Sequence, residues 1–126
     1  MKYEDLNDFT RAYIDAIFFT ETGEDNPEFD GKGFYDFAAE TLKRIIEDCT
    51  GFELNNKGLL EKAVKFSNKK YTIDQAGHDL WLTRNGHGAG FWDRGLGDVG
   101  ELLAIEAQNM GSISLVSGDD GKLYLE

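Results

Sequence analysis

The stretch AGHDLWLTRNGHGAGFWDRG, residues 76–95, constrains the fold of this chain more than any other segment. It is rich in glycine and contains both histidines and both tryptophans of the chain. Its two halves, HDLWLTR and AGFWDR, alternate apolar and polar residues, as half-buried strands do. Asn85-Gly86 lies between them, and both residues tolerate the positive φ angles that a two-residue turn needs. These features predict a β-hairpin over residues 76–95.

Two registers of this hairpin fit the sequence. A two-residue turn at Asn85-Gly86 places His78 opposite Asp93 at the edge of the apolar face, close enough for a hydrogen bond. The same register gathers the apolar side chains on one face: Leu80, Leu82, Ala89 and Phe91. We favour this register because it leaves no charged side chain buried alone.

The alternative register has a four-residue turn, NGHG. It stacks Trp81 on Trp92 and pairs Asp79 with Arg94 across the strands. It also places Asp93 on the apolar face, where an unpaired charge costs several kcal/mol, well above the ~1–3 kcal/mol of an unsatisfied polar group.

Helical spacing of apolar residues predicts four helices in the rest of the chain. They span residues 4–19, 34–49, 57–66 and 97–110. Gly51 is expected to end the second helix and Gly111 the fourth. Near the end of the chain, SISLV and KLYLE flank the turn sequence SGDDG and predict a second hairpin. The order predicts an α+β fold in one domain, residues 1–126, with about four helices on a small antiparallel sheet built from two β-hairpins.

The net charge of −11 is unevenly distributed. Residues 1–50 carry 13 acidic and 5 basic side chains, residues 51–95 carry 5 and 7, and residues 96–126 carry 6 and 1. This field repels phosphate backbones and attracts basic surfaces, so direct binding of nucleic acid is not expected. The single cysteine, Cys49, lies on the apolar stripe of the second helix and is expected to be a core residue. With no secretory signal or apolar run of membrane length, a cytoplasmic protein is expected.

The candidate binding residues all lie in the predicted hairpin: His78, Trp81, Arg84, His87, Trp92, Asp93 and Arg94. A His78–Asp93 pair could orient an imidazole, but the stretch contains no serine or cysteine nucleophile. His78 and His87 would lie at opposite ends of the strand pair, so no shared metal ion is expected, and no cofactor either. The segment RGLGDVG could hold an anion at the start of the fourth helix, although glycines there also suit an ordinary tight turn.

The run AGHDLWLTRNGHGAGFWDRGLGDVG resembles one found in small uncharacterised bacteriophage and prophage proteins, often written AGHDFWLTRNGHGAGFWDR. The likeness extends to ETLKRIIEDCTGF and SGDDGKLY, and so covers most of residues 34–124. Leu80 stands where the family has phenylalanine. The resemblance implies a soluble protein made in the cytoplasm of an infected bacterium. The family carries no established activity, so the resemblance assigns no catalytic residues.

These observations favour a non-catalytic accessory protein over an enzyme. In this hypothesis the hairpin supplies an aromatic anchor, and the acidic half steers the protein toward a basic surface of a host or phage protein. Such a protein could act as an acidic inhibitor or DNA mimic against a nucleic-acid-binding or defence protein. The alternative is a small nucleotide- or phosphate-binding protein, or an enzyme, with its site at residues 78–94. A homodimer that pairs hairpin edges is a third possibility.

Overall fold

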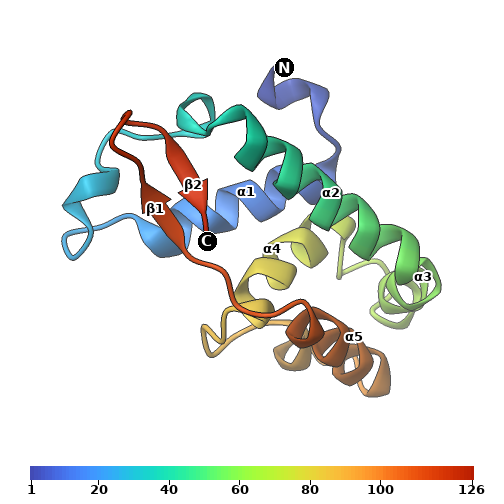
Figure 1. The fold of residues 1–126 in the computed structure, drawn as a ribbon. Helices are drawn as coiled ribbons and strands as arrows, with labels where there is room; N and C mark the ends of the chain where they lie inside the picture. Colours follow the sequence, from blue (N-terminus) through green and yellow to red (C-terminus); the bar gives the residue numbers. More distant parts are fainter.

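The computed structural model describes residues 1–126, and five α-helices form most of the protein (Figure 1). The regular elements are α1 (Asp8–Glu21), α2 (Ala39–Asn55), α3 (Lys57–Phe66), α4 (Ile73–Arg84), α5 (Asp98–Asn109), β1 (Leu115–Ser117) and β2 (Leu123–Leu125). Four short 3-10 turns accompany them: η1 (Tyr3–Asp5), η2 (Pro27–Phe29), η3 (Phe34–Asp36) and η4 (Phe91–Asp93). None of the helices combines the length and apolar character needed to cross a bilayer.

The α1–α4 pair is the centre of the fold, because these two helices contact each other more extensively than any other pair. Their contact is close because Gly77 of α4 lies directly against the backbone of Phe9 in α1. Phe52 of α2 stacks between Phe9 and Phe91, with ring centroids 6.0 and 5.8 Å away. The buried apolar side chains of all five helices and both strands belong to one cluster of 27 residues.

The predicted hairpin over residues 76–95 is wrong, because its first half is helix α4 and its second half is a loop containing η4. Thr72 caps the start of α4, where its Oγ1 accepts a hydrogen bond of 3.4 Å from the Gln75 amide. Asn85 is the C-cap residue of α4, and Gly86 after it adopts a left-handed conformation with φ of 65°. The His87 amide then donates to the Leu82 carbonyl at 3.1 Å, which is the Schellman arrangement.

The alternating pattern in HDLWLTR was misleading because α4 is buried on nearly all sides. The eight buried residues of this helix are Ala76, Gly77, Asp79, Leu80, Trp81, Leu82, Thr83 and Arg84. A helix with neighbours all round needs no apolar stripe, and its polar side chains are buried with partners. The asparagine–glycine pair was a sound turn signal, but a glycine with positive φ ends helices as well as making hairpins.

The remaining elements correspond more closely to the sequence predictions. Helix α3 has the predicted bounds of 57–66, and α5 differs from the predicted 97–110 by one residue at each end. The C-terminal hairpin is confirmed, with Leu115 opposite Leu125 and Ser117 opposite Leu123. It lies beside the start of α2, at the end of the molecule away from α3 (Figure 1).

Helix α2 differs from its predicted bounds at both ends. It begins at Ala39, after the separate turn η3, and continues through Gly51 to Asn55. Gly51 keeps helical geometry and does not end the helix. Ala38 ends the preceding extended segment, and its amide donates to the Leu123 carbonyl of β2 at 3.0 Å. The protein is therefore α+β in a coarse sense only, with five helices and a single two-stranded sheet instead of two hairpins.

Candidate functional site

Several of the predicted site residues build the interior of the protein instead of a binding surface. Trp81 is fully buried against Tyr13, and its indole Nε1 donates to Thr20 Oγ1 of α1 at 2.8 Å. The Arg84 side chain is only 2% exposed. Both residues lie on α4 and point into the core, so neither can contact a partner without local unfolding.

Arg84 joins three segments through one buried guanidinium. Its Nη1 donates to the Tyr13 hydroxyl at 3.1 Å and to Asp48 Oδ2 at 3.0 Å. Its Nε and Nη2 donate to the carbonyls of Gly111 and Met110 at 2.8 and 3.2 Å. Burial opposes the charged form, but Tyr13 and Asp48 outweigh it and raise the pKa of Arg84. The guanidinium therefore fixes the turn after α5 onto α1, α2 and α4.

Arg94 has a comparable role around a buried carboxylate. Asp79 is fully buried and accepts hydrogen bonds from Arg94 Nη2 at 2.7 Å and from Arg94 Nε at 3.1 Å. The Tyr71 hydroxyl donates to the same carboxylate at 2.7 Å. Burial and then the charge of Asp79 raise the pKa of Tyr71 far above its usual value. The pairing of Asp79 with Arg94, which the four-residue turn predicts, does form. It joins helix α4 to the loop after η4 and not two strands.

The other four predicted residues do not come together. His78 is half-buried on α4 and Asp93 lies in the separate turn η4, so the predicted bond between them does not form. Nδ1 of His78 has no hydrogen-bond partner. Asp93 is exposed in η4, and Trp92 beside it is 41% exposed. His87 lies after α4, with Nε2 3.9 Å from Glu21 Oε1. No group of three or more His, Cys, Asp or Glu side chains is arranged to hold a metal ion.

Cys49 confirms the sequence prediction of a core residue. It is fully buried in α2, and burial raises the pKa of its thiol far above the usual value. A buried, protonated thiol is a poor nucleophile, so Cys49 contributes packing and not chemistry.

A groove between α1 and the start of α4 is the best-supported candidate site. One part, of about 290 Å³, is lined by Ala12, Asp15, Thr72, Asp74, Gln75 and His78. The adjoining part, of about 360 Å³, is lined by Tyr3, Asp8, Arg11, Ala12, Asp15 and Asp74. The two parts share Ala12, Asp15 and Asp74, so they form one continuous surface groove.

The groove is predominantly acidic. Among its lining residues Arg11 is the one permanent cation, and it is already paired with Asp8 on the same helix. Asp15 accepts a hydrogen bond of 2.7 Å from the Tyr3 hydroxyl, and burial together with this bond raises the pKa of Tyr3 to about 12. Asp74 forms no ion pair at all. The carboxylates of Asp15 and Asp74 therefore remain without a cationic partner.

An exposed aromatic ring lies beside His78, which lines this groove. Phe19 of α1 is 76% exposed, and its ring centroid lies 5.9 Å from that of His78. His78 contributes a buried Nδ1 without a partner, which accepts a hydrogen bond when the imidazole is protonated at Nε2. Carboxylates and an exposed ring suit a cationic side chain with an apolar stem.

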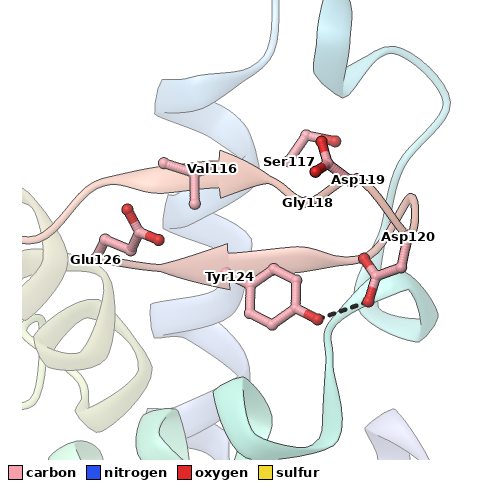
Figure 2. Close-up of a pocket in the computed structure, with 7 residues that line it drawn as sticks. All are labelled: Val116, Ser117, Gly118, Asp119, Asp120, Tyr124 and Glu126. Carbon is pink, nitrogen blue, oxygen red and sulfur yellow. Dashed lines mark hydrogen bonds between the residues drawn. The ribbon is translucent and has the colours of Figure 1, made fainter.

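A second hollow lies on the C-terminal hairpin (Figure 2). It has a volume of about 560 Å³ and is lined by Val116, Ser117, Gly118, Asp119, Asp120, Tyr124 and Glu126. Tyr124 donates to Asp120 at 2.6 Å, and this bond lowers the pKa of Asp120. The hollow is an open face of a two-stranded ribbon with no buried polar group lacking a partner, and we do not assign a ligand to it.

Sequence reasoning found His78 but missed most of the groove. Asp15 and Asp74 are exposed acids in an acidic chain, and only the packing of α1 against α4 brings them together. The available signal was Thr72-Ile-Asp-Gln75, a capping-box pattern that marks a helix start at this position.

Comparison with protein-family models, curated proteins and solved structures finds no match to this chain.

Proposed function

We propose that this protein is a non-catalytic binding module whose α1–α4 groove holds a lysine or arginine side chain of a partner protein. The observation that carries the proposal is the acidic lining, in which Asp15 and Asp74 have no cationic partner within the chain. The net charge of −11 attracts such a partner over a longer range. The exposed ring of Phe19 offers a surface for the apolar stem of the bound side chain.

The proposed partner is a host or phage protein with a basic surface. The resemblance to phage and prophage proteins favours a bacterial cytoplasm as the place where the two would meet. A basic surface that normally contacts nucleic acid would be blocked by the acidic module, so this proposal includes inhibition by charge mimicry. Direct binding of nucleic acid has no part in it, because the charge of the protein repels phosphate backbones.

The first test replaces the two unpaired carboxylates. An arginine- and lysine-containing peptide, titrated in 0.15 M salt, should bind Asp15→Asn/Asp74→Asn about fivefold more weakly than the parent. The reason is that two exposed ion pairs together contribute about 1 kcal/mol, which corresponds to about fivefold in affinity. Asparagine preserves the size of the side chains and can still accept the hydrogen bond from Tyr3.

The matched control is Glu101→Gln/Glu106→Gln, which removes the same charge from exposed positions on α5. Its peptide affinity should change by less than twofold. If both double variants weaken binding equally, the peptide responds to net charge alone and the groove is not a site. Phe19→Ala adds an independent readout, because it should weaken peptide binding without lowering stability.

A further inference from the structure

A cavity of about 320 Å³ lies where the end of α3, the start of α4 and the loop before α5 meet. Its lining residues are Phe66, Ser67, Lys70, Tyr71, Gln75, Arg94 and Gly95. Gln75 also lines the acidic groove, so the two hollows adjoin at this residue. Unlike the groove, this cavity is lined by two cationic side chains, Lys70 and Arg94, and by no carboxylate.

The polar groups of the cavity have unused hydrogen-bond donors. Arg94 uses Nε and Nη2 to bind Asp79, whereas its Nη1 makes no hydrogen bond. Lys70 forms no ion pair. The backbone amide of Gly95 donates no hydrogen bond within the chain, and neither does the side-chain amide of Gln75. Four donors from three separate segments therefore line one cavity without partners.

The local charge differs from that of the whole protein. Residues 57–70 carry five lysines and one glutamate in a chain with a net charge of −11. Asp79 beneath the cavity is already neutralised by Arg94. Asp93, next to Arg94 in the chain, and Asp74, next to Gln75, are acidic residues that oppose an anion. At 0.15 M salt the Debye length is about 8 Å, so charges farther than this from the cavity are largely screened.

The backbone that presents Lys70 is held in an unusual conformation. Asn68 and Lys69 have φ angles of 59° and 66°, which side-chain-bearing residues adopt at an energetic cost. Their amides close the end of α3 through bonds to Lys65 and Val64 of 3.0 and 2.9 Å. Two successive left-handed residues reverse the chain, and Lys70 and Tyr71 then follow along the wall of the cavity.

We propose that this cavity binds the phosphate group of a small phosphate monoester between Lys70 and Arg94. Phosphate needs several N–H donors and net positive charge, and the cavity supplies both. Phe66, 64% exposed at the cavity mouth, provides a surface on which a nucleobase would stack. The site shares Arg94 and Gly95 with the segment RGLGDVG of the sequence-based anion hypothesis, but its other lining residues come from the end of α3 and the start of α4. It also differs from the acidic groove, so either proposal can fail alone.

The experiment is an NMR titration of the protein with inorganic phosphate and, separately, with adenosine monophosphate, each up to 20 mM. Both ligands should shift the amide signals of Gly95 and Lys70. Lys70→Gln should weaken binding at least fivefold, whereas Lys62→Gln, an equal change of charge on α3 outside the cavity, should change it less than twofold. Arg94 is left intact because it neutralises Asp79.

The two ligands distinguish the source of the phosphate. If adenosine monophosphate binds more tightly than inorganic phosphate, and Phe66→Ser removes this difference, the ligand is a nucleotide. If the two ligands bind with equal affinity, the cavity recognises the phosphate group alone. The proposal is overturned if neither ligand shifts these amides by 20 mM, or if Lys70→Gln and Lys62→Gln weaken binding equally. Asp15→Asn/Asp74→Asn should bind phosphate at least as tightly as the parent, which separates this test from that of the groove.

Discussion

Arg84→Ala should lower the free energy of unfolding by about 3–5 kcal/mol, the usual cost of removing one partner from a buried ion pair. The substitution leaves Asp48 without its buried partner and removes a donor from the Tyr13 hydroxyl. The carbonyls of Met110 and Gly111 lose their hydrogen bonds at the same time. Asp48 keeps 26% of its side-chain surface and can recover some hydration, so the lower half of the range is expected. Urea unfolding followed by tryptophan fluorescence measures the change.

Arg44→Ala is the matched control, because Arg44 also faces Asp48. Its Nε lies 3.9 Å from Asp48 Oδ2, and its side chain is 49% exposed. An exposed pair of this kind contributes about 0–1 kcal/mol, so this variant should unfold almost like the parent. If Arg84→Ala and Arg44→Ala lower the free energy of unfolding equally, the buried guanidinium of Arg84 does not hold α1, α2 and the turn after α5 together.

Gly77→Ala should destabilise the protein by about 3 kcal/mol, at the upper end of the range for overpacking. A Cβ at this position would lie 2.0 Å from the Phe9 carbonyl oxygen and 2.8 Å from its carbon. Both atoms belong to backbone, so no side-chain rotation relieves the clash and α1 must move away from α4. The same movement would distort the groove, and peptide affinity should fall together with stability.

Gly58→Ala is the control, because it is expected to change stability in the opposite direction to Gly77→Ala. Gly58 is an exposed residue of α3 without a positive φ, and a Cβ added there would meet no neighbouring atom within 4 Å. Alanine in a helix is favoured over glycine by about 1 kcal/mol, so this variant should be slightly stabilised. If Gly77→Ala also raised stability in urea unfolding, the close α1–α4 contact would be wrong.

Local patterns predicted the amphipathic helices well and the buried helix badly. Helix α3 has one apolar side and a lysine-rich exposed side, so its period could be recognised. Helix α4 has no such contrast from Ala76 onward, because its leucines and the charged residues Asp79 and Arg84 are all buried. Its sequence carries the cap patterns Thr72-x-x-Gln75 and Asn85-Gly86, and the second pattern is equally typical of a hairpin turn.

Local sequence patterns were also insufficient to predict the candidate sites. Several polar side chains of residues 76–95 form pairs inside the protein, as in the Asp79–Arg94 and Arg84–Asp48 ion pairs. Thr83 accepts a hydrogen bond from the Phe91 amide, and a Cβ at Gly90 would lie 2.1 Å from the Thr83 Oγ1 atom. The two hollows instead combine residues from distant segments, such as Asp15 with Asp74 and Lys70 with Gly95. Only the tertiary packing brings these residues together.

The helical conformation of α4 can be measured through the backbone 13C chemical shifts over residues 72–93, with nuclear Overhauser contacts in the same segment. Helix-type shifts are expected from Ile73 to Arg84, with contacts three and four residues apart and a contact between Gly77 and Phe9. Strand-type shifts, with cross-strand contacts between Leu82 and Ala89, would contradict the helix. They would remove the groove and the cavity together, because both are built on α4 and the residues around it.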